Sequence, residues 1–148
     1  MATLTGSCLC GGITYRYDGP LGAVVHCHCS RCRRWHGAAF RTRAVAHRSA
    51  FQWTAGAELL ARYAMTPRTT RTFCRKCGSS LITEYTEEPD RIALPLGGVV
   101  GDLDAGPAFH IFVASKASWH TITDDLPQFD ELPPDRASIH RLPGDERG

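Results

Sequence analysis

The sequence has no long hydrophobic run and almost no imbalance of charge. Its apolar stretches are only a few residues long, far short of the roughly 20 residues that span a membrane as a helix. The 17 Lys and Arg residues nearly balance the 15 Asp and Glu residues, giving a formal net charge of +2. Nucleic acids and anionic lipids attract strongly basic surfaces. We therefore expect no membrane association, and the weak charge disfavours nucleic acid as a partner.

Several familiar signals are also missing. The first seven residues have neither the basic nor the apolar segment of a secretory signal peptide, so we expect a cytoplasmic protein. The glycine-rich stretch 97–101 lacks the Lys and the Ser or Thr of a phosphate-binding loop. Residue spacing supports no Ser-His-Asp triad and no pair of catalytic carboxylates. No repeat of fixed period is present.

Short β-prone segments separated by turn signals dominate the chain, and helix signals are few. This pattern predicts a mainly β domain of short antiparallel strands with little helix, arranged as a barrel or a sandwich. Ser30 is a candidate N-cap for one short helical turn that ends at Gly37. The expected strands are Ile13–Tyr17, Val24–Cys27, Ala38–Val45, Phe51–Trp53, Leu59–Tyr63, Thr69–Cys74, Ser80–Tyr85, Arg91–Leu94 and Phe109–Val113.

The character of the chain changes near residue 126. Pro127, Pro133, Pro134 and Pro143 interrupt any long element, and apolar residues become fewer. We interpret residues 1–125 as one domain. Residues 126–148 are interpreted as a Pro-rich C-terminal tail that packs on this domain or on a partner subunit of a homodimer.

Seven cysteines are the most unusual feature of the composition. An odd number without a signal peptide argues against a disulfide framework. In a reducing compartment, clustered cysteines more often bind metal or take part in chemistry. All seven lie in three clusters: Cys8 and Cys10; Cys27, Cys29 and Cys32; and Cys74 and Cys77.

Two of these clusters predict a structural metal site. Cys74 and Cys77 have the spacing of a metal-binding knuckle, and Gly78 relieves backbone strain after the second ligand. Cys8 and Cys10 are two residues apart, so an extended backbone places both sulfurs on one face. Together the pairs supply the four thiolates of a closed zinc site, although such a site also suits iron. The alternative is that these are buried free cysteines.

The middle cluster offers only three thiolates. A tetrahedral ion held by Cys27, Cys29 and Cys32 keeps one position open, which is the property that separates catalytic from structural zinc sites. Other interpretations stay open at this point. One of the cysteines could join a different pairing, the three could oxidise without metal, or a histidine could close the fourth position. The candidate histidines are His26, His28 and His36.

Basic residues crowd the middle cluster. Guanidinium groups there could hold the carboxylates of an anionic small substrate and lower the pKa of nearby thiols. The alternative is an ordinary solvated face. The residues concerned are Arg31, Arg33, Arg34, Arg41 and Arg43, with Arg75 and Lys76 as candidates from the third cluster.

The three cysteine motifs resemble those of the glutathione-dependent formaldehyde-activating enzyme (Gfa) family, which includes the zinc-binding domain of centromere protein V. The resemblance runs from about Gly6 to Trp119. Its closing segment begins at Phe109. The motifs are Gly6-x-Cys8-x-Cys10-Gly11-Gly12, His26-Cys27-x-Cys29-x-x-Cys32 and Phe73-Cys74-x-x-Cys77-Gly78-Ser79. This resemblance implies a zinc-containing β-tent fold, related to the Mss4-like fold. It also implies a structural zinc at Cys8, Cys10, Cys74 and Cys77, and a catalytic zinc at Cys27, Cys29 and Cys32.

The resemblance also implies a reaction. The reaction that names the family joins glutathione and formaldehyde into S-hydroxymethylglutathione. We therefore expect a zinc-dependent carbon–sulfur lyase that forms or breaks an adduct between an aldehyde and glutathione or another small thiol. The alternative is a non-catalytic module whose zinc sites only stabilise a surface for a protein or nucleic-acid partner.

Overall fold

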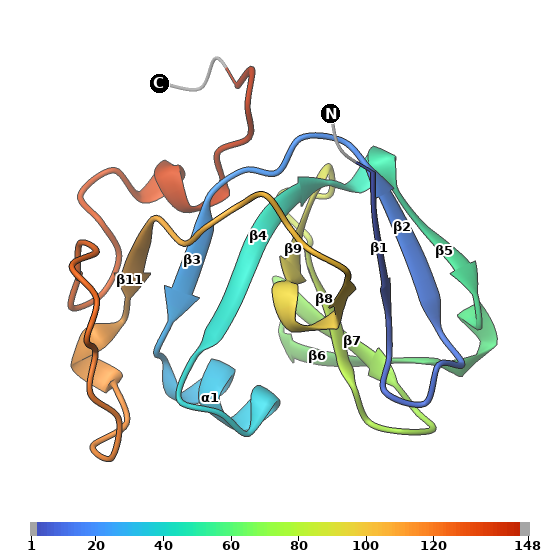
Figure 1. Ribbon diagram of the computed structural model, residues 1–148, viewed down its shortest axis with the longest axis horizontal. Coiled ribbons are helices and arrows are strands. Elements are labelled where there is room, and N and C mark those ends of the chain that lie inside the picture. Colours follow the sequence, from blue (N-terminus) through green and yellow to red (C-terminus); the bar gives the residue numbers. More distant parts are fainter. Residues whose placement is uncertain (1–2, 146–148) are drawn as a thin grey trace.

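The computed structural model describes residues 3–145, which form two β-sheets and one α-helix (Figure 1). In the four-stranded sheet, buried and exposed side chains alternate along the strands. In β2 (Thr14–Asp18), Tyr15 and Tyr17 are buried while Arg16 faces solvent. Because successive strand residues point to opposite faces, one face of this sheet joins the core. Its strand order is β10-β1-β2-β5, with β1 at Thr3–Ser7, β5 at Phe51–Ala55 and β10 at Val99–Val100.

The second sheet has seven strands in the order β11-β3-β4-β9-β8-β7-β6. All its neighbours pair antiparallel except β11 and β3, which run parallel. All five residues of β9 are buried, as expected for a strand near the centre of a sheet covered on both sides. The bounds are β3 Val24–Cys27, β4 Arg41–His47, β6 Leu60–Thr66, β7 Thr69–Cys74, β8 Ser80–Tyr85, β9 Arg91–Pro95 and β11 Phe109–Ile111.

One α-helix, α1 (Ser30–His36), follows β3 directly. Its N-cap is Cys29 and not Ser30, because the Cys29 sulfur accepts a hydrogen bond from the Cys32 N–H. The predicted cap was therefore wrong by one residue. Gly37 ends the helix with a left-handed φ of 57° and donates its N–H to Arg33 O, a role that favours glycine. Short 3-10 segments cover Arg48–Ala50, Ala57–Leu59, Leu96–Gly98, Val113–Ser115 and Arg136–His140.

Two hydrophobic clusters hold the sheets in place. The larger one joins both sheets and includes Tyr15 and Phe51 from the first and Ile82 and Ile92 from the second. The smaller one surrounds Val25 on β3 and contains two of the cysteines. Its members are Val25, Cys27, Cys32 and Ile111, with Phe109, Phe112, Phe129, Leu132 and Ile139 packed against them.

The segment after residue 126 runs beside β11 and β3 (Figure 1). Phe129 N–H donates to His110 O, and Phe112 N–H donates to Glu131 O. Near the end of the described chain, Arg91 donates two hydrogen bonds of 2.6 and 2.7 Å to the Asp145 carboxylate. The division of the chain at residues 125 and 126 stays a prediction. Residues 1–2 and 146–148 of these two units lie outside the described residues.

The predicted mainly β fold with little helix is confirmed. The strands differ from the predictions in two respects. β1 and β10 were not predicted, and the observed bounds of β2, β4, β5, β6, β9 and β11 differ from the predicted ones. In β11 the strand stops at Ile111 instead of Val113 because Phe112 adopts a positive φ of 55°. In the part of the chain that the structure describes, no helix has the length and apolar character to cross a bilayer.

Candidate functional site

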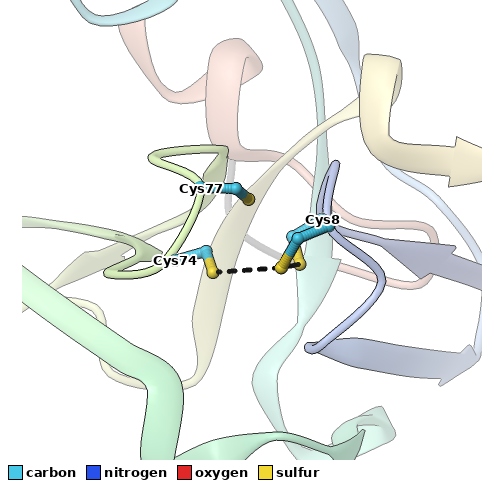
Figure 2. A group of neighbouring side chains, drawn as sticks. Cys8, Cys74 and Cys77 are labelled. Carbon is cyan, nitrogen blue, oxygen red and sulfur yellow. Dashed lines mark hydrogen bonds between the residues drawn. The ribbon is translucent and has the colours of Figure 1, made fainter.

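The two outer cysteine pairs meet between the sheets. Cys8 and Cys10 lie in the turn after β1, whereas Cys74 ends β7 and Cys77 lies in the turn that follows. Figure 2 shows the side chains of Cys8, Cys74 and Cys77 directed toward one another from these two turns. All four sulfurs lie within 4.8 Å of one another. The structure thus brings together two pairs from different sheets.

The geometry of these four sulfurs fits a zinc ion. The Cys8–Cys10 and Cys10–Cys74 sulfur distances are 3.5 and 3.9 Å. A tetrahedron with zinc–sulfur bonds of about 2.3 Å has edges of roughly 3.8 Å. Backbone N–H groups support thiolate charge, since Ile13 N–H points at the Cys8 sulfur and Gly12 N–H at the Cys10 sulfur. These features suit four thiolates around one ion.

The middle cysteines form a second group. Cys27 ends β3, Cys29 caps α1 and Cys32 lies in the first turn of that helix. Their three sulfurs also lie within 4.8 Å of one another. Within residues 3–145, no histidine belongs to this group, and His28 Nε2 instead lies 2.8 Å from His110 Nδ1. Three thiolates with no fourth protein donor fit a tetrahedral metal ion that keeps one position for another ligand.

A cavity of about 470 Å³ opens beside the three cysteines. This volume lies within the 300–1,000 Å³ range that is usual for small-molecule sites. Exposed Arg31 lies at the cavity, and the side chains of Leu132 and Ile139 contribute apolar wall. Three further arginines line it from β4 and β7, and they are almost completely buried: Arg41, Arg43 and Arg71.

These buried arginines carry positive charge without a carboxylate partner. In the described part of the chain, none of the three forms an ion pair with Asp or Glu. Arg41 and Arg71 both donate to Thr83 Oγ1 at 3.2 Å, and Arg43 donates to the Ile139 carbonyl at 2.6 Å. Burial lowers the pKa of Arg43 to about 10, so its guanidinium still carries charge at neutral pH. The cavity therefore offers an unusual concentration of unpaired positive charge.

The arginines act on the cysteines. Arg71 Nη2 lies 3.6 Å from the Cys32 sulfur. Hydrogen bonds from Cys27 and Cys29, together with the charges of Arg41 and Arg71, lower the pKa of the Cys32 thiol despite its burial. These contacts therefore favour the thiolate of Cys32, which is the form that binds metal.

Sequence reasoning identified part of this basic lining and missed its most important member. Arg31, Arg41 and Arg43 line the cavity, but the other predicted basic residues do not. Arg75 instead donates to the Glu58 carbonyl. Arg71 was missed, although a lone cation inside the β-prone segment Thr69–Cys74 was a visible signal. The residues that do not line the cavity are Arg33, Arg34, Arg75 and Lys76.

Comparisons with known proteins agree with the cysteine pattern. A model of the glutathione-dependent formaldehyde-activating enzyme family matches residues 3–115. No curated protein matches the chain. Among solved structures, a Rhodobacter sphaeroides protein is 27% identical, with a TM-score of 0.57, over 68% of this chain and 91% of that one. Because the family match covers most of the sequence, the chain belongs to the glutathione-dependent formaldehyde-activating enzyme family.

Proposed function

We propose that this protein forms or breaks the adduct between glutathione, or a similar small thiol, and a small aldehyde such as formaldehyde. The observation that carries the proposal is the group of three cysteine sulfurs beside a cavity lined by buried arginines that form no ion pair with Asp or Glu in residues 3–145. Membership of the family supports the same reaction. The enzyme would be a carbon–sulfur lyase in the direction of adduct breakdown.

The residues present assign different roles to the two cysteine groups. Cys8, Cys10, Cys74 and Cys77 would hold a zinc ion that stabilises the fold. The second zinc would be held by Cys27, Cys29 and Cys32. When bound with an open position, zinc supplies a Lewis acid that favours the deprotonated form of a thiol at neutral pH.

The protein's own side chains would bind and orient the substrate. Glutathione carries two carboxylates, and the fork of a guanidinium group matches a carboxylate in two parallel hydrogen bonds. Exposed Arg31 at the cavity would bind such a carboxylate, while Arg41 and Arg71 would supply positive charge close to the thiol end. The apolar wall at Leu132 and Ile139 would exclude water from one side of the bound substrate.

The reaction needs little beyond this positioning. The thiolate sulfur adds to the carbonyl carbon, so a C–S bond forms while the π bond of the C=O group breaks. The carbonyl oxygen takes up a proton from solvent to give the hydroxymethyl group, which balances the proton lost from the thiol. Holding the two reactants together in the correct orientation accounts for the expected acceleration.

Exchange spectroscopy by NMR tests the proposal directly, since it measures how fast free glutathione and its formaldehyde adduct interconvert. Zinc-loaded protein should accelerate the exchange beyond matched solution without protein. Cys29→Ser should abolish the acceleration while the protein stays folded. Arg34→Ala should retain it, because Arg34 is exposed on the same helix and does not line the cavity. No acceleration with both zinc sites filled would favour the non-catalytic binding module instead.

A further inference from the structure

A cluster of histidines lies on the face of β3 and β11 opposite to Cys27. His26 on β3 and His110 on β11 are direct partners in the parallel register, so their imidazole rings lie side by side with centroids 4.8 Å apart. The next residues along these strands, Cys27 and Ile111, are also partners. Because adjacent strand residues face opposite ways, the histidines and Cys27 lie on opposite faces of the sheet.

A carboxylate completes this cluster. Both oxygens of Asp124 lie 3.0 Å from His110 Nε2. The donor atoms of His26, His110 and Asp124 all lie within 4.8 Å of one another. Two ligands that are each about 2.1 Å from one metal ion lie roughly 3.0–3.4 Å apart in octahedral or tetrahedral geometry. The His110–Asp124 separation already has this value, and Asp124 lies on an exposed segment that can adjust.

The second nitrogen of each imidazole is held by the protein. His26 Nδ1 lies 2.7 Å from Thr42 Oγ1, and His110 Nδ1 lies 2.8 Å from His28 Nε2. Such bonds fix the orientation and the tautomer of histidines that bind metals. With Nδ1 held in both rings, Nε2 of each histidine is the nitrogen available to a metal ion near Asp124. The Asp124 side chain is 43% exposed, so solvent can reach the cluster.

The hydrogen bonds that link His28, His110 and Asp124 leave one buried ring nitrogen without a partner among the described residues. His28 is completely buried, and its Nδ1 has no hydrogen-bond partner in residues 3–145. If His110 donates from Nδ1 to His28, the lone pair of His110 Nε2 faces the Asp124 carboxylate, which is a repulsive arrangement. A cation between them removes the repulsion. Leu126 N–H donates to Asp124 Oδ1 at 3.0 Å, which holds the carboxylate beside His110.

We propose that His26, His110 and Asp124 bind a divalent metal ion at a third site, separate from the two cysteine groups. Two imidazoles and one carboxylate form the donor set of several zinc and non-haem iron sites, in which water fills the open positions. This donor set suits ions such as Zn²⁺, Co²⁺, Ni²⁺ and Fe²⁺. The contrasting arrangement is a simple hydrogen bond from His110 to Asp124 that needs no metal.

Titration of the zinc-loaded protein with Co²⁺ distinguishes these arrangements. With both cysteine sites filled by zinc, a further equivalent of Co²⁺ should bind and give weak visible bands. The strong near-ultraviolet charge transfer of cobalt bound to thiolate should be absent. Metal analysis after gel filtration should show two zinc ions retained per chain, which excludes exchange at the cysteines.

Variants locate the added ion. Asp124→Asn preserves the size of the side chain and an oxygen acceptor for His110, but it should weaken Co²⁺ binding at least about tenfold. Asp125→Asn is the matched control, because Asp125 is exposed beside Asp124 and lies outside the cluster. Equal affinity in the two variants, no additional Co²⁺ in the parent protein, or cobalt–thiolate charge transfer would overturn the proposal. These readouts do not depend on the thiol–aldehyde reaction.

Discussion

Replacing Arg71 by Met should weaken zinc binding at the three-cysteine group while leaving the other site unchanged. The Arg71 guanidinium lies 3.6 Å from the Cys32 sulfur. At an effective dielectric constant of about 20, opposite unit charges at this distance attract by roughly 4–5 kcal/mol. Solvent in the adjoining cavity and the remaining charge of Arg41 reduce the net effect. We expect a loss of about 10–100-fold in zinc affinity, the range typical when a partner of a metal ligand is removed.

Competition with a chelator measures the zinc affinity of both cysteine sites in the same molecule. The site of Cys8, Cys10, Cys74 and Cys77 serves as the internal control, since its zinc should leave at the same chelator concentration in parent and variant. Met retains apolar contact with the Trp35 ring, over which the Arg71 guanidinium carbon lies 4.6 Å from the centroid. Arg71→Lys keeps the charge and should show a smaller loss. Release of zinc from the three-cysteine group at an unchanged chelator concentration in Arg71→Met would refute the electrostatic argument.

Three further predictions concern stability. Cys77→Ala should unfold the domain in circular dichroism, because structural zinc contributes about 10–16 kcal/mol of apparent binding free energy to folding; a folded variant with normal melting would contradict the assignment. Burial and the charge of Arg41 lower the pKa of His36 to about 4, so the unfolded chain binds more protons between about pH 6.5 and pH 4. Stability should therefore fall as pH drops through this window, by less than roughly 3 kcal/mol because the ring is partly exposed. Denaturant midpoints should show a flatter decline for His36→Asn, and parallel curves would contradict the prediction. Gly22→Ala should loosen the segment after residue 126, because the new Cβ would lie 2.2 Å from the Arg141 carbonyl oxygen; we expect about 1–3 kcal/mol of destabilisation and faster proteolysis of this segment, and unchanged cleavage would argue against the contact.

Local chemistry explains why much of the fold was predictable. Val24–Cys27, Thr69–Cys74 and Ser80–Tyr85 were predicted with the observed bounds, because turn residues or cysteine motifs delimit each segment. β10 (Val99–Val100) was not predicted, since two residues carry no periodicity and the strand exists only by pairing with β1. The parallel pairing of β3 and β11 likewise depends on tertiary structure, which brings together segments more than eighty residues apart.

In the candidate site, too, residues within one short motif were predictable, whereas residues from segments far apart in the sequence were not. Cysteine spacing identified the two groups of sulfurs because each motif is short. Arg71 and the His26–His110 pair were missed, since their importance depends on strands that become neighbours only in the folded chain. Trp119 ends the segment that resembles the family, and a lone Trp at this place predicts burial in the core or, as the alternative, an apolar wall of the cleft beside the three cysteines. Its side chain is 72% exposed, whereas the apolar wall of the cavity comes from Leu132 and Ile139.

A metal ion held by the four-cysteine site would also link the two sheets directly. Cys10 and Cys74 are 64 positions apart, and a cross-link that closes a loop of this length lowers the entropy of the unfolded chain by about 4 kcal/mol in free energy. Each hairpin alone presents only two of the four thiolates, so neither sheet binds zinc tightly before it meets the other. Metal uptake should therefore report docking of the sheets during folding. Conversely, zinc release should mark the moment when the sheets separate during unfolding.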